Sequence, residues 1–211
     1  MLLAYDIEGK VRLEPPFPEP VKITVSKEQQ GDCGSVKSSP LLQISPEGYV
    51  ANAVVKLEGD FPDTAPPVQN QSFVLDQTHC EFVPHVLLIP RGAPLSILNS
   101  EPFLHNVRAF DEKANMLFNQ AMPIQGSLLK KTFEKGGRIT LRCGVHHWMY
   151  ALVIVQDHPY YALTDESGFF KLQNVPDGNH TLIVWHEALG EIRQSVNPQN
   201  AKVSVQYSAA K

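Results

Sequence analysis

Hydrophobic and polar residues alternate along most of the chain, in short segments separated by turn-forming residues. A period of two places one set of side chains on the buried face of a β-strand and the other set in solvent. The strand-like segments are residues 5–13, 21–25, 50–57, 86–89, 95–98, 106–110, 137–143 and 150–155. Residues 111–131 are the least strand-like, and we expect a short helical turn near 111–118. The expected fold is therefore all-β.

The C-terminal part has its own series of strands and turns. Residues 161–172 contain two apolar segments joined by Asp165-Glu-Ser-Gly168, a turn-forming sequence that predicts a hairpin. A second turn, Asn174-Val-Pro-Asp-Gly178, precedes a strand-like run at 181–186. The Pro-rich stretch at 61–67 predicts a linker.

Composition and charge exclude several classes of protein. With 43% hydrophobic and 19% charged residues, the chain can bury a core and is not disordered. A net charge of −4 gives no electrostatic basis for binding nucleic acid. No apolar run approaches the ~18 residues of a transmembrane helix, and Met1-Leu-Leu-Ala4 is too short for a signal peptide. The oligomeric state is left open.

A thiol, an imidazole and a thioether recur at three-residue intervals in Cys143-Gly-Val-His146-His-Trp-Met149. These are ligand types of a blue-copper site, in which two His and one Cys lie in a plane with a weak axial Met. His105, upstream, is available as the second imidazole. Soft sulfur ligands select copper, and zinc rarely accepts a thioether. We expect these four side chains to bind a copper ion at one end of a β-sandwich, although Cys143 and Met149 could also be ordinary core residues.

This set of residues resembles the cupredoxins of the amicyanin and plastocyanin type. Leu104-His105-Asn106-Val107 and the Cys-x-x-His-x-x-Met loop occupy the places of the two ligand segments of that family. The preceding residues 82–99 are similar as well, so the resemblance covers about 72–156 and implies a Greek-key β-sandwich. Two residues differ, because Val145 and His147 stand where amicyanins usually carry Pro. Both His147 and His85 are further candidates for the imidazole ligands.

The same resemblance implies roles for the neighbours of the ligands. Asn106 would brace the Cys loop by a hydrogen bond, unless it is a simple turn residue. An exposed His edge ringed by apolar residues serves the family as the docking surface for a redox partner. His146, His147 and Trp148 are the candidates for that surface here, and Trp148 could equally be a core residue.

The C-terminal strands resemble a different family, the carboxypeptidase regulatory-like module, a small transthyretin-like β-sandwich. The resemblance rests on Thr164-Asp-Glu-Ser-Gly-Phe169 and on the Pro-Asp-Gly turn at 176–178. The two opening strands of that module match Gly9-Lys-Val11 and residues 51–57, far upstream. We therefore expect a discontinuous module, residues 1–66 and 158–211, with a copper domain at 67–157 inserted in it. Three units in series are the alternative.

If Cys143 is a ligand, Cys33 and Cys80 remain. An even remainder predicts one disulfide and an oxidising compartment, so a periplasmic or otherwise exported protein, while two reduced thiols are the alternative.

The expected function is electron transfer through a type 1 copper ion, with a redox protein as the partner. The first alternative is a copper carrier without electron transfer, for which His79, His85 and His147 could supply an open site. The second is a β-sandwich interaction module without metal. An enzyme is not expected, because no nucleophile–base set, paired carboxylates or phosphate-binding loop occurs and a closed copper site leaves no position for substrate.

Overall fold

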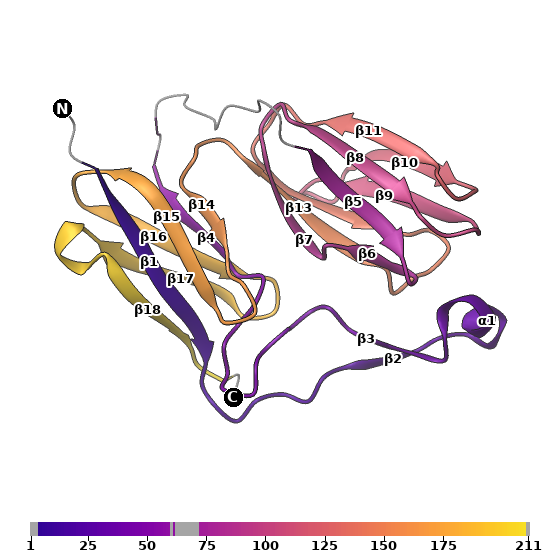
Figure 1. The fold of residues 1–211 in the computed structure, drawn as a ribbon, viewed down its shortest axis with the longest axis horizontal. Coiled ribbons are helices and arrows are strands. Elements are labelled where there is room, and N and C mark those ends of the chain that lie inside the picture. The colour runs from indigo at the N-terminus through magenta and orange to yellow at the C-terminus, as the bar shows by residue number, and fades with distance from the viewer. Residues whose placement is uncertain (1–3, 60, 62–71, 210–211) are drawn as a thin grey trace. The chain divides into compact units, whose positions relative to one another are not determined.

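A computed structural model describes residues 4–59, 61 and 72–209 and shows a nearly all-β protein (Figure 1). The predicted linker at 61–67 lies, apart from Phe61, outside the described residues. The chain divides into two compact units, one formed by residues 1–21, 39–62 and 160–211 and the other by residues 22–38 and 63–159. The helices among the described residues are single turns, far short of the ~20 residues that a bilayer span requires.

The unit formed by residues 22–38 and 63–159, called here the second unit, contains two large sheets and a two-stranded one among its described residues. Its main strands are β5 (Phe73–Thr78), β6 (Glu81–Val83), β7 (Val86–Pro90), β8 (Pro94–Asn99), β9 (His105–Phe110), β10 (Met116–Met122), β11 (Leu128–Thr132), β12 (Gly137–Arg142) and β13 (Tyr150–Gln156). One sheet has the order β10-β9-β12-β13-β7, and the other has the order β11-β8-β5-β6. The pairs β13–β7 and β5–β8 are parallel and the remaining pairs are antiparallel.

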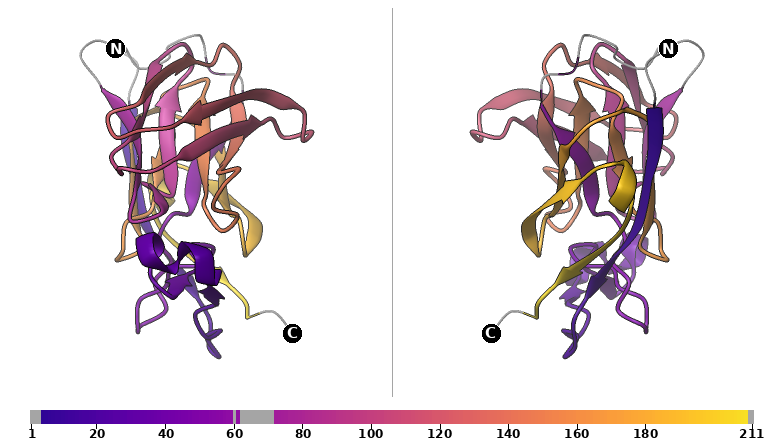
Figure 2. Two further views of the ribbon diagram at one scale, coloured as in Figure 1. Left: turned by 90° about the vertical axis from the view of Figure 1, so that its right-hand side faces the viewer. Right: turned by 90° about the vertical axis from the view of Figure 1, so that its left-hand side faces the viewer.

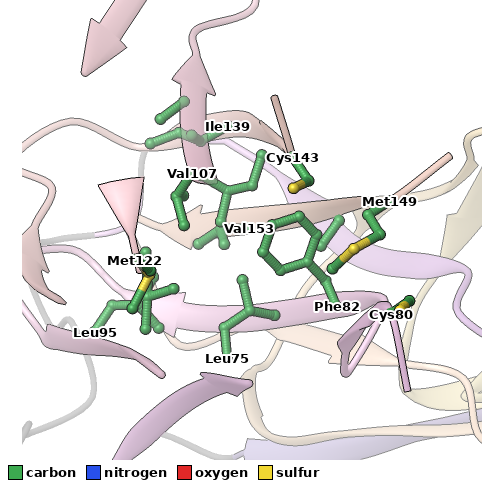
Figure 3. Packing of buried hydrophobic residues seen from close by; sticks show 14 of the residues in the cluster. Leu75, Cys80, Phe82, Leu95, Val107, Met122, Ile139, Cys143, Met149 and Val153 are labelled. Atoms are coloured by element: carbon green, nitrogen blue, oxygen red, sulfur yellow. The ribbon is translucent and has the colours of Figure 1, made fainter. Parts of the chain in front are cut away.

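The hydrophobic pattern explains which strands are central in this unit. The apolar run of β13 is buried on both faces, as expected for a strand with neighbours on either side and a core beneath it. Strand β9 alternates, and Val107 and Ala109 point into the core. Figure 3 shows this core, with Leu75, Phe82 and Val153 among its members.

The expectation for residues 111–118 is wrong, because this stretch forms a tight turn and then β10 rather than a helical turn. The carboxylate of Asp111 accepts hydrogen bonds from the backbone N–H groups of Lys113 and Asn115, at 2.9 and 2.8 Å. Strand β10 follows and β11 comes after it, each at the edge of its sheet. Most residues of these two edge strands are exposed, so their side chains need not alternate between apolar and polar. The hydrophobic pattern therefore did not indicate these strands.

Residues 22–38, called here the hairpin segment, form a short antiparallel strand pair with a helical turn between the strands and belong to the second unit. It contains β2 (Lys22–Thr24), the 3₁₀ turn η1 (Lys27–Gln29), α1 (Gln30–Cys33) and β3 (Val36–Ser38). The side chains of Val25 and Cys33 are buried in the core of the second unit. Cys33 forms a disulfide with Cys80, with Cα atoms 5.5 Å apart. This disulfide joins α1 to the turn between β5 and β6, both labelled in Figure 1, and Figure 2 shows the helical turn of the hairpin segment from two further sides. We expected residues 22–38, as part of 1–66, to belong to the carboxypeptidase regulatory-like module, whereas they pack with the second unit.

The unit formed by residues 1–21, 39–62 and 160–211, called here the first unit, contains two sheets in the part that the structure describes. Its elements are β1 (Ala4–Leu13), β4 (Val54–Glu58), β14 (Tyr161–Leu163), β15 (Phe169–Pro176), β16 (His180–His186), β17 (Gly190–Val196), η2 (Pro198–Asn200) and β18 (Lys202–Tyr207). The sheet orders are β14-β4-β16-β17 and β15-β1-β18. Strand β4 therefore pairs with strands more than a hundred residues downstream, and Lys56 lies opposite Ile183.

The turn at 165–168 is present, but it does not make a paired hairpin. Strand β14 pairs with β4, and β15 pairs with β1 in the other sheet. The hydroxyl of Thr164 donates to the carbonyl of Val50 and accepts from the N–H of Ala53, both at 2.8 Å. These bonds hold the chain at the point where it crosses between the sheets.

Candidate metal centre

Three of the four predicted ligand residues converge in the second unit. His105 is the first residue of β9, Cys143 follows β12 and His146 lies in the loop before β13. The Cys143 sulfur is 3.8 Å from Nδ1 of His105 and 3.8 Å from Nδ1 of His146. The two Nδ1 atoms are 3.1 Å apart. All three side chains are buried, and one thiol and two imidazole nitrogens face each other.

The Cys143 loop is closed by its own backbone. Strands β12 and β13 pair up to Arg142 and Tyr150, so the loop must fold within the remaining residues. The Cys143 N–H donates to the Met149 carbonyl at 3.1 Å, and the Met149 N–H donates to the His146 carbonyl at 2.9 Å. Met149 is buried in the same core, and Figure 3 shows its side chain at the end of the core where Cys143 lies.

The surroundings of Cys143 favour a thiolate. Burial alone would raise the pKa of this thiol. Hydrogen bonds with His105 and His146, and backbone N–H groups of His146 and Val145 at 3.4 Å, outweigh burial and lower the pKa of Cys143 to about 5. Only the thiolate is a strong metal ligand, and this low pKa makes Cys143 a thiolate at neutral pH.

Glu101 orients the His105 ring, and sequence reasoning missed it. The Glu101 carboxylate is 2.8 Å from Nε2 of His105, the ring nitrogen that faces away from Cys143. Burial lowers the pKa of His105, but its bonds with Cys143 and with Glu101 outweigh burial and raise it. Carboxylate–histidine pairs of this kind fix the ring and its tautomer beside a metal. The signal in the sequence was an acidic residue four positions before the histidine.

Asn99, the last residue of β8, organises the loop that carries Glu101. Its side-chain amide donates to the carbonyls of Phe103 and Met122, each at 3.0 Å. Its side-chain oxygen accepts from the Glu101 N–H at 2.9 Å. The fully buried Asn99 thus positions the segment between β8 and His105.

The three neighbours at the end of the Cys loop have different environments. His146 is only 4% exposed, so it does not itself form the exposed edge that we expected. His147 is exposed and lies outside the cluster. Trp148 is half-buried, with its ring 5.4 Å from that of His146 and its indole N–H donating to the Cys80 carbonyl at 2.9 Å.

Asn106 reaches the Cys loop without a hydrogen bond to it. Its amide donates to the side-chain oxygen of Asn119 at 2.8 Å. Its own oxygen accepts no bond from the described residues and is close enough to Gly144 that a Cβ there would lie 2.7 Å away. Asn106 therefore contacts the loop at a residue that must stay small.

The other candidate histidines lie elsewhere in the unit. His85 is buried, with Nδ1 3.2 Å from the Tyr150 carbonyl and its ring packed edge-on against the Tyr150 ring. His79 is exposed in the turn after β5. Among the described residues, neither belongs to a group of converging ligand atoms.

No protein-family model and no curated protein matches this chain. Solved structures similar to it include a purple cupredoxin from Nitrosopumilus maritimus, at 23% identity over 40% of this chain and 100% of that one, with a TM-score of 0.36. The Cu(I) form of a mutant amicyanin matches at 20% over 48% and 98%, with a TM-score of 0.38. A copper-containing nitrite reductase from Thermus scotoductus SA-01 matches at 22% over 41% and 22%, with a TM-score of 0.34. With these identities and TM-scores, the similarity gives no information about the candidate metal site. The evidence for that site is its own geometry.

Proposed function

We propose that this chain is a type 1 copper protein that acts in electron transfer. The observation that carries the proposal is the convergence of the Cys143 sulfur and the Nδ1 atoms of His105 and His146 in a buried cluster. These residues come from two strand ends and a loop, so the fold rather than chain proximity brings His105 to the other two.

The chemistry of this donor set fits copper. A thiolate and two imidazoles form the trigonal part of a blue-copper site, and the thioether of Met149 is the axial ligand we propose. Zinc rarely takes a thioether, and the hard cations prefer oxygen ligands. Bound copper would supply a one-electron redox couple. The chain would hold it, with Glu101 orienting His105 and backbone N–H groups on the Cys143 sulfur tuning the potential.

Electron transfer fits this site better than catalysis. The three clustered residues are buried, and together with Met149 they would fill all four ligand positions. A metal that binds substrate needs an open position. A buried cluster that supplies every ligand itself would instead limit rearrangement between two oxidation states. We propose a redox protein as the partner, which docks where the exposed His147 and the half-buried Trp148 adjoin the centre.

The disulfide bears on the cellular compartment. A buried disulfide is typical of an oxidising compartment, so we propose a periplasmic or otherwise exported protein.

We also propose that the first unit is a carboxypeptidase regulatory-like module interrupted by the copper unit. The pairing of β4 with β16 supports this proposal, because β4 needs strands from beyond residue 160 to complete its sheet.

Anaerobic copper titration with visible spectroscopy tests the function. We expect one Cu(II) per chain and an intense blue thiolate band. A matched Cys143→Ser variant should keep the fold, since the side chain is small, and should lose the band. A wild-type protein that binds Cu(I) but never becomes blue would instead be a carrier, and one that binds no copper would leave an interaction module. A Cys143→Ser variant that stays blue would reassign the thiolate ligand.

A further inference from the structure

A second cluster of soft ligand atoms lies beside the first. The sulfur atoms of Cys33 and Cys80 and a ring nitrogen of His146 all lie within 4.8 Å of one another, and all three residues are buried. The two cysteines are joined as a disulfide, in which neither sulfur is a strong metal ligand. Figure 3 shows Cys80 at the same end of the core as Cys143 and Met149.

The hairpin segment that carries Cys33 is held by contacts other than the S–S bond. Val25 is 1% exposed and packs in the core of the second unit. The side-chain amide of Gln29 donates to the Val145 carbonyl at 3.1 Å, beside His146 in the Cys loop. Lys37 forms an ion pair with Glu81 at 3.6 Å. These contacts would keep Cys33 near the loop when the disulfide is open.

Cys80 is held in place from the other side. Its N–H donates to the Glu101 carboxylate at 3.0 Å, and its carbonyl accepts from the Trp148 indole at 2.9 Å. Neither bond involves its sulfur. Cleavage of the disulfide would therefore leave both thiols facing the same imidazole.

We infer that Cys33 and Cys80, once reduced, form with His146 a second metal site that binds Cu(I). A dithiol would transfer two electrons and two protons to the disulfide, breaking its S–S bond and closing to a disulfide of its own. Each cysteine thiol would then give up its proton on binding the metal. The disulfide would thus keep this site closed under oxidising conditions and open it under reducing ones.

The donor set selects the metal. Thiolates are soft ligands that favour Cu(I) and zinc. Zinc takes four protein ligands, or three with a fourth position open to water, whereas this cluster offers three ligands that are all buried. The inference goes beyond the proposed function, because its two thiols differ from Cys143 and the site does not depend on a blue centre. Only His146 is common to both clusters.

The test uses the full chain in a Cys143→Ser background, which removes the thiolate of the first cluster. The protein is reduced with dithiothreitol, freed of the reagent under anaerobic conditions and titrated with Cu(I) against a chromogenic Cu(I) chelator. We expect one tightly bound Cu(I) per chain after reduction and none in the sample left oxidised. Visible spectra of wild-type protein titrated with Cu(II), with the disulfide oxidised or reduced, show separately whether the blue centre of the proposed function forms.

Two further variants serve as controls in the same background. Adding Cys33→Ser and Cys80→Ser should abolish the Cu(I) binding that reduction produces. Adding His146→Ala should weaken it by more than about tenfold, since the loss of even an outer partner of a ligand costs ~10–100-fold. The inference is overturned if the reduced Cys143→Ser protein binds no more Cu(I) than the triple serine variant. Circular dichroism and tryptophan fluorescence, to which Trp148 beside Cys80 contributes, follow the hairpin segment. Release of this segment on reduction without Cu(I) binding would overturn the inference equally.

Discussion

The side chain of Cys143 shows how a residue's chemistry depends on its neighbours. An isolated buried thiol would hold its proton more tightly than one in water. Here two imidazoles and two backbone N–H groups surround the sulfur and lower the pKa instead. The sequence predicted which residues would meet, but the ionisation follows from distances that only the folded chain sets.

The low pKa of Cys143 predicts a pH dependence of stability in the metal-free protein. Between about 5, its folded pKa, and the ordinary 9.0, the unfolded chain keeps a thiol proton that the folded protein has lost. This contribution to the unfolding free energy is complete above 9.0 and disappears as the pH falls through about 5. The raised pKa of His105 acts in the opposite sense, since its contribution is present below 6.5 and lost above. The net rise is therefore clearest from pH 5 to 6.5.

Denaturant unfolding followed by tryptophan fluorescence measures this rise. We expect the unfolding free energy of the wild type to gain up to about 2 kcal/mol over that interval relative to Cys143→Ser, since one group contributes at most ~1.4 kcal/mol per pH unit. Parallel pH profiles for the two proteins would show that Cys143 is protonated in the folded state.

Glu101 is the second residue whose role can be tested. A Glu101→Gln substitution keeps the size of the side chain and removes the charge that acts on Nε2 of His105. We expect copper affinity, measured by competition with a chelator, to fall about tenfold, as for other outer partners of metal ligands. Glu81→Gln is the matched control, because Glu81 is half-exposed and pairs with Lys37 instead. Equal affinities in the two variants would exclude an orienting role for Glu101.

At the level of elements, β9 and β13, with a buried alternating or apolar pattern, were predictable, and the largely exposed edge strands β10 and β11 were not. Strand β13 and strand β9 were predicted within a residue or two because burial selects their side chains. The edge strands β10 and β11 are stabilised mainly by backbone pairing with their neighbours, which leaves little trace in side-chain pattern. Backbone hydrogen bonds are available to any non-proline residue, so sequence alone could not separate these strands from loops.

Strand β1 gives a prediction at this scale. It is the central strand of its sheet, and a Cβ at Gly9 would lie 2.3 Å from the Val203 carbonyl oxygen and 3.0 Å from the Phe170 ring. Gly9→Ala must push β18 away, so we expect the first unit to lose about 1–3 kcal/mol of stability. Thermal unfolding measures the loss, and the copper band should be unaffected. Gly31→Ala, with no atom within 4 Å of the added methyl, is the control. An unchanged melting profile for Gly9→Ala would mean that β1 and β18 are not closely paired.

At the scale of the whole molecule, the disulfide joins segments 47 residues apart, on either side of the part of the first unit that contains β4. A disulfide stabilises mainly by restricting the unfolded chain, commonly by about 2–4 kcal/mol. The Ser39 N–H already donates to the Val21 carbonyl at 2.8 Å, so both ends of the hairpin segment are tied when the first unit is folded. We therefore expect Cys33→Ser/Cys80→Ser to cost the second unit about 2 kcal/mol.

Calorimetry of the metal-free double variant measures this cost, and the first unit serves as the internal reference. A loss confined to the second unit is the expected result. Equal losses in both units would show that the disulfide supports the chain as a whole, and no loss would show that Val25 and Gln29 suffice to hold the hairpin segment.

On its own, the sequence was enough to predict the all-β class and the Cys143 to Met149 loop, because period and loop spacing are local properties of the chain. His105 was predicted as the counterpart of this loop from the resemblance of its segment to a cupredoxin ligand segment. The sequence also left Cys33 and Cys80 as a candidate pair. The folded chain was needed to show that Glu101 orients His105, that His146 is buried, and that the hairpin segment with its disulfide lies beside it. The reason is physical: these contacts join segments distant in sequence, and packing chooses among many such pairings that local pattern leaves equally open.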